Sequence, residues 1–175
     1  QGKNRHPHDH NRDYGERSTY PEVAAIKRFV PAWSGGRLVA FVDLHCPCLS
    51  GTHNEEIYLV GSPIPSIWQA QQAFSEILSR TEGGPLPCDM SAILPFGVSW
   101  NREPEAGLVS SARWASGLPG IRLATTIEIP YANAGGVEVT QETARLFGRR
   151  LCRALSTYLR EGADDEASWT RYPRC

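Results

Sequence analysis

The chain has 175 residues, the length of one ordinary domain that can bury a sizeable core. Its hydrophobic content of 41% and charged content of 21% are those of a soluble globular protein. A formal net charge of −1, and the lack of any apolar run of roughly 20 residues, exclude the usual signals of nucleic-acid binding and of a membrane span and leave the compartment open.

The chain opens with a polar segment and a helix. Residues 1–17 are polar and irregular, and fit either a solvated loop or an independent metal site made by three alternating histidines, His6, His8 and His10. Thr19 and Glu22 form a capping-box pattern that begins a helix. Pro31 is expected to end this helix, because proline lacks the N–H that a helix interior needs.

A strand is predicted next. Residues 38–42 form an apolar run of a kind that is buried on both faces of an α/β sheet. Asp43 and His45 follow on the same side of the strand, at the carboxyl end, where such sheets bind ligands. Cys46 and Cys48 are interpreted as small side chains that line a site, because cysteines that bind zinc are usually spaced by two to four residues.

The middle of the chain predicts a short strand over residues 57–60 and a helix that begins near Ser66 and ends before Gly83. One face of this helix is apolar, with Ile67, Ala70, Phe74, Ile77 and Leu78. Residues 83–120 show little periodicity, and so long an irregular stretch in a compact domain indicates a functional lid or wall.

The last part predicts a strand over residues 121–129 and a helix from Thr140 to Gly162. Glu128 lies in this strand among apolar neighbours, so it is either paired with an arginine or a functional carboxylate with a shifted pKa. The predicted organisation is one α/β domain over residues 1–162, followed by a polar tail over residues 163–175.

Three short motifs follow one another along the chain. Residues 2–5 and 9–14 contain Arg5 and the sequence DHNRDY, residues 43–45 read DLH, and residues 125–128 read TTIE. In this order they resemble the zinc carboxypeptidase, or metallocarboxypeptidase, family. The resemblance implies a three-layer fold with a mixed central sheet flanked by helices.

The same resemblance implies roles for single residues. His45 would bind one zinc ion, with Asp43 behind it, and Glu128 would be the general base that activates the zinc-bound water. Arg5 would stabilise the oxyanion of the scissile carbonyl. Asn11 and Arg12 would grip the C-terminal carboxylate of a peptide or related amide.

The specificity position of the family falls on Arg113 when counted back from Glu128 without gaps. An arginine there would favour substrates that end in an acidic residue.

The chain also departs from the family pattern. The family's first two zinc ligands come from an H-x-x-E pair before the arginine loop, whereas the pair here, His53 and Glu56, follows His45. The family's loop tyrosine is missing too, since no tyrosine lies between Tyr58 and Tyr131. The chain is therefore expected to be the latter part of a carboxypeptidase domain, with two zinc ligands outside it.

Two functions follow from these patterns. The first is a zinc-dependent hydrolase that removes the C-terminal residue of a peptide. The second is a non-catalytic module that keeps the arginine site and binds peptide C-termini. Neither involves a nucleic acid or a membrane.

Overall fold

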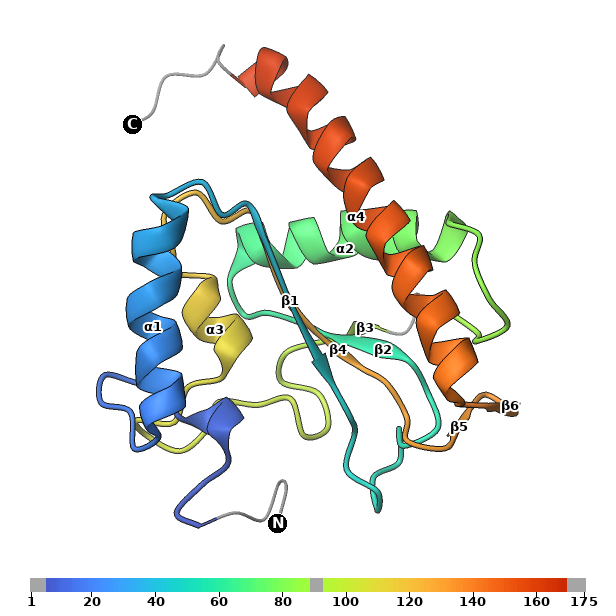
Figure 1. The fold of residues 1–175 in the computed structure, drawn as a ribbon, viewed down its shortest axis with the longest axis horizontal. Coiled ribbons are helices and arrows are strands. Elements are labelled where there is room, and N and C mark those ends of the chain that lie inside the picture. Colours follow the sequence, from blue (N-terminus) through green and yellow to red (C-terminus); the bar gives the residue numbers. More distant parts are fainter. Residues whose placement is uncertain (1–5, 89–92, 170–175) are drawn as a thin grey trace.

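The computed structural model describes residues 6–88 and 93–169, with side chains up to residue 161. It is a mixed α/β fold, as predicted, with a four-stranded sheet between helices (Figure 1). In the described ranges no helix is both long and apolar enough to cross a membrane. The elements in chain order are η2 (His10–Arg12), α1 (Pro21–Ser34), β1 (Ala40–His45), β2 (Tyr58–Val60), α2 (Pro65–Arg80), β3 (Ile93–Leu94), α3 (Ser111–Ala115), β4 (Leu123–Glu128), β5 (Asn133–Ala134), β6 (Val137–Glu138) and α4 (Gln141–Trp169).

The sheet has the strand order β1-β4-β2-β3 and is mixed. β1 and β4 run parallel, while β2 runs antiparallel to β4 and parallel to β3. In the register of β1 and β4, Asp43 lies opposite Thr126 and His45 opposite Glu128. Because the two strands are parallel and in register, their last residues lie side by side at one end of the sheet.

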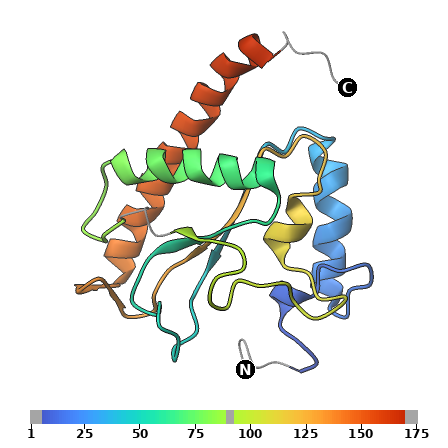
Figure 2. The same cartoon turned by 180° about the vertical axis from the view of Figure 1, so that it is seen from behind.

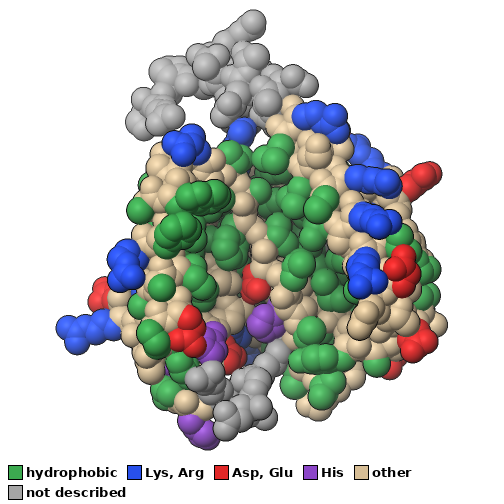
Figure 3. All heavy atoms as spheres, viewed as in Figure 1, with side chains coloured by type: hydrophobic (Ala, Val, Ile, Leu, Met, Phe, Trp, Pro, Cys, Tyr) green, Lys and Arg blue, Asp and Glu red, His purple; other side chains and the backbone are tan. Residues whose placement is uncertain are grey.

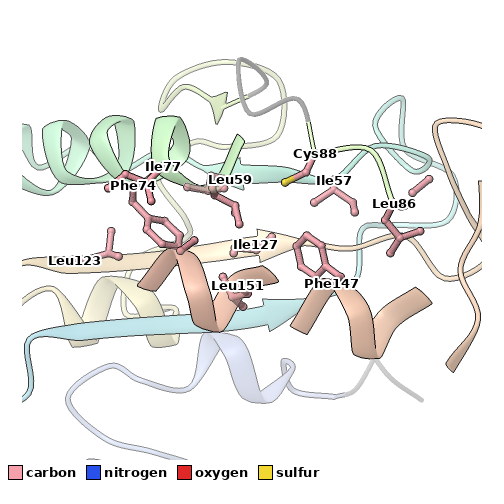
Figure 4. Close-up of a cluster of buried hydrophobic side chains, with 13 residues drawn as sticks. Ile57, Leu59, Phe74, Ile77, Leu86, Cys88, Leu123, Ile127, Phe147 and Leu151 are labelled. Atoms are coloured by element: carbon pink, nitrogen blue, oxygen red, sulfur yellow. The ribbon is translucent and has the colours of Figure 1, made fainter. Parts of the chain in front are cut away.

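β4 is the most deeply buried strand, and all six of its residues are buried. Because its side chains alternate, Leu123 and Ile127 join the main core, whereas Ala124 packs in a second cluster with Ala115 of α3. The main core lies between the sheet, α2 and α4 (Figure 4). Its members include Ile57, Leu59, Phe74, Ile77, Leu78, Leu123, Ile127, Phe147 and Leu151.

The prediction that the first strand is buried on both faces is wrong. The strand begins at Ala40 and lies at the edge of the sheet, so it has β4 on one side only. None of its residues is buried, and Leu44 is 56% exposed. Hydrophobic side chains gather over α1, β1 and the facing side of α4 (Figure 3). An apolar run in the sequence shows that a strand is hydrophobic, but it does not show whether other helices or strands cover it.

One predicted helix start needs correction. Tyr20, and not Thr19, is the N-cap of α1, and no side chain caps it. α2 begins at Pro65, near Ser66 as predicted. The predicted cap of the last helix is also confirmed, because the hydroxyl of Thr140 accepts a hydrogen bond from the N–H of Thr143 at 3.2 Å.

The predicted helix ends are wrong at both breakers. α1 continues through Pro31 to Ser34 and ends at Gly35, which has a φ of +53° and donates to the carbonyl of Pro31. α4 continues through Gly162 to Trp169, into the predicted polar tail. A glycine inside a helix costs only about 1 kcal/mol relative to alanine, so it does not by itself end one.

Candidate functional site

A cavity of about 830 Å³ lies beside the carboxyl ends of β1 and β4. It is lined by most of the predicted site residues, which come from four separate parts of the chain: Asn11, Arg12, His45, Arg113 and Glu128. The predicted catalytic Arg5 lies outside the described residues. Of the two cysteines interpreted from the sequence as lining a site, Cys48 borders this cavity and Cys46 does not.

One wall of the cavity comes from the long segment between β3 and α3, which Figure 2 shows in yellow-green. Phe96, Trp100 and Leu108 are among the residues that line it. The buried side chain of Asn101 fixes this wall, because it donates to the carbonyls of Gly61 at 2.9 Å and Leu94 at 3.1 Å. Part of the irregular stretch 83–120 therefore forms a wall of this cavity, while its predicted functional role stays a prediction.

Backbone hydrogen bonds hold the η2 segment against this wall. The N–H of Tyr14 donates to the carbonyl of Val109 at 3.0 Å, and the N–H of Val109 donates to the carbonyl of Arg12 at 3.1 Å. Below them, Asp13 is 2% exposed and accepts hydrogen bonds from His8 and from the N–H groups of Thr19 and Tyr20. Burial alone would raise the pKa of Asp13, but these hydrogen bonds lower it.

Asp43 gathers several donors on a single oxygen, Oδ2. Asn11 Nδ2 lies 2.9 Å from it, Ser111 Oγ 3.2 Å and Thr126 Oγ1 3.4 Å. The Nδ1 of His45 lies 3.6 Å from the same oxygen. Burial alone would raise the pKa of Asp43, but its contacts with His45, Ser111 and Asn11 outweigh burial and lower the pKa.

Glu128 lies next to His45 across the β1–β4 pair and is 3% exposed. On its other side it faces Tyr58 of β2. Burial, and after it the charge of Glu128, raises the pKa of Tyr58 to about 12. A buried carboxylate thus lies beside a histidine, and both residues line the cavity.

Three arginines and three acidic residues, Asp9, Glu103 and Glu128, line the cavity, but the arginines make no direct contact with a described carboxylate. The arginines are Arg12, Arg102 and Arg113, and no described carboxylate lies within 4.0 Å of their guanidinium nitrogens. Arg12 donates through Nη1 to the carbonyl of Asn11 at 2.9 Å, which holds its guanidinium near that loop. Such unpaired guanidinium groups are suited to binding a carboxylate.

The described residues do not complete a metal centre. They contain no group of three or more His, Cys, Asp or Glu side chains that could hold an ion, so His45 does not belong to a complete set of zinc ligands among them. His8 and His10 contact different carboxylates, those of Asp13 and Glu22, at 2.8 and 2.9 Å. A zinc ion at His45 needs ligands beyond the described residues.

The H-x-x-E pair that follows His45 lies at the surface. His53 Nδ1 and Glu56 Oε2 lie 3.0 Å apart, and both side chains are substantially exposed. Neither residue lines the cavity.

Sequence reasoning missed two residues of the site. Thr126 lines the cavity, and its alternation with Glu128 along the strand was a signal that could have placed it there. Ser111 contacts Asp43 and Asn11, but it lies 100 residues from Asn11 in the chain. No local pattern relates residues so far apart.

No protein-family model matches the chain, and the search of curated proteins found no similar sequence. The function of the site is therefore argued from its residues and their geometry.

Proposed function

We propose that this chain is part of a zinc-dependent, metallocarboxypeptidase-like hydrolase that removes the C-terminal residue of a peptide or related amide. The observation that carries the proposal is the meeting of His45 and Glu128 with Asn11, Arg12 and Arg113 in one cavity. The fold would be the latter part of the three-layer carboxypeptidase domain.

In this proposal each group has a separate task. Zinc, held by His45 and by two ligands outside this chain, would supply a polarised water. Glu128 would take the proton of that water and pass it to the leaving amine. The fork of Arg12 would hold the substrate's carboxylate, beside Asn11. Arg5, outside the described residues, keeps its proposed role at the oxyanion.

A second function is favoured by one specific observation. The described residues bring only one of the expected zinc ligands to the cavity, yet they bring three arginines without a described carboxylate partner. A non-catalytic module that binds peptide C-termini would need the arginines and not the metal. The two functions share carboxylate recognition and differ in hydrolysis.

Arg12→Met is expected to weaken the binding of N-acetyl-glycyl-leucine by about 10- to 100-fold, because it removes charged hydrogen bonds to the carboxylate. Arg12→Lys should fall between this variant and the wild type, since lysine keeps the charge and loses the fork. Isothermal titration calorimetry measures both. The C-terminal amide of the same peptide is the control, and equal affinity for acid and amide would contradict carboxylate recognition.

Arg113→Glu is expected to reverse a preference for C-terminal glutamate over leucine. Arg113 is exposed, so the affinity for each of the two substrates should change only modestly, by about fivefold or less. Arg102→Glu is the matched control, because it makes the same charge change at another exposed position of the cavity. If both variants change the preference equally, Arg113 has no special place in specificity.

A further inference from the structure

The contacts around Asn11 fix which way its side-chain amide faces. Nδ2 lies 2.9 Å from Asp43 Oδ2, and Oδ1 lies 2.7 Å from the backbone N of Ser111. An ionised carboxylate only accepts hydrogen bonds, and a backbone N–H only donates. The opposite flip of the amide would place acceptor against acceptor and donor against donor, so the two partners select one orientation.

This orientation leaves one donor of Asn11 over. The Nδ2 group carries two hydrogens, and Asp43 takes one of them. No other described residue accepts from Nδ2, and Asn11 lines the cavity. Its backbone carbonyl meanwhile holds the guanidinium of Arg12 at 2.9 Å. A spare amide N–H and a guanidinium thus stand on the same short loop.

We propose that Asp43 and Ser111 are positioning residues for substrate recognition, which hold the Asn11 amide so that its second N–H donates to the ligand's carboxylate beside Arg12. The inference rests on the proposed function. It gives Asp43 a task beyond its contact with His45, since one carboxylate oxygen then supports both the predicted metal ligand and the carboxylate grip.

Exchanging the two side chains, Asn11→Asp with Asp43→Asn, separates the contact that supports the fold from the N–H that would bind the ligand. Asn11→Asp sets two carboxylates against each other and should lower the melting temperature. Adding Asp43→Asn restores a donor-to-acceptor contact with reversed polarity, while the Ser111 N–H still has an acceptor at position 11. The double variant should therefore recover most of the lost melting temperature. It now presents a carboxylate, and no N–H, to the ligand.

The test combines thermal denaturation with calorimetry on the whole chain, using N-acetyl-glycyl-leucine and its C-terminal amide. We expect the double variant to melt near the wild type and to bind the acid about tenfold or more weakly. A double variant that melts and binds like the wild type would overturn the positioning role. Failure of the wild type to prefer acid over amide would instead overturn the proposed function.

A second measurement needs no variant to fold. In ¹⁵N-labelled wild-type protein the side-chain NH₂ signals of Asn11 should shift when the acid is added and stay in place with the amide. Asn54, whose Nδ2 donates to the carbonyl of Leu49 and which does not line the cavity, is the internal control and should not respond selectively. An Asn11 signal that ignores the acid, at concentrations that saturate the protein, would also overturn the inference.

Discussion

Glu128→Gln is expected to lower the rate of peptide hydrolysis by about 10²- to 10⁴-fold, the usual contribution of a general base. Glutamine has nearly the shape of glutamate but cannot accept a proton at neutral pH. Glu128 is 3% exposed and lies beside His45, so the replacement changes the chemistry with little room to change the geometry. The rate should be measured on protein that has zinc bound and that contains the zinc-binding residues which the described residues do not supply.

Binding separates a chemical effect from a structural one. The affinity of the Glu128→Gln variant for N-acetyl-glycyl-leucine should stay near that of the wild type, because the arginine grip is untouched. Glu138→Gln is the matched control, since it removes one carboxylate at an exposed position on β6. Full activity of the Glu128→Gln variant would show that the assigned mechanism is wrong. A wild-type protein that binds the acid and never cleaves it would favour the binding module.

The strand ends of the site could be predicted because strand geometry is local. Alternation depends on nearest neighbours in the chain: it placed Asp43 with His45, and the same rule relates Thr126 to Glu128, although Thr126 was not predicted as a site residue. The structure adds the register, in which each member of the first pair lies opposite a member of the second. That match needs the position of one strand relative to another about 80 residues away, and no local pattern contains it.

The role of Ser111 in the site could not be predicted from the sequence for a similar reason. Ser111 begins α3, a helix of 5 residues, which is too short to show helical periodicity. Its contacts with Asn11 and Asp43 span 100 and 68 residues of sequence. The prediction of a wall in this region came from the lack of a pattern, so it could name the segment and not the residue.

The predictions of the helix ends were wrong for a different physical reason. Pro31 and Gly162 lower the local preference for a helix, and the sequence alone shows only this preference. Pro31 lies in the last turn of α1, and the helix ends three residues later, at Ser34. Tertiary packing and neighbouring residues decide whether the free-energy cost of a proline or a glycine ends a helix.

Phe74→Ala is expected to lower the free energy of unfolding by about 3 to 5 kcal/mol, the usual cost of removing a buried phenylalanine. Phe74 is fully buried, in the core that also contains Leu123 and Ile127 of β4 (Figure 4). It also meets Tyr158 of α4 edge to face, with ring centroids 5.8 Å apart. The loss is a large part of the 5 to 15 kcal/mol that typically stabilises a domain.

Phe29→Ala is the matched control for this prediction. It removes the same side chain from α1, where Phe29 is 63% exposed, and should change the unfolding free energy by about 0.5 kcal/mol or less. Urea denaturation followed by circular dichroism measures both variants. Because Leu123 and Ile127 alternate with Thr126 and Glu128 along one strand, a cavity at Phe74 should also loosen the site and weaken carboxylate binding. Equal losses in the two variants would show that α2 and α4 do not form the core on which the site rests.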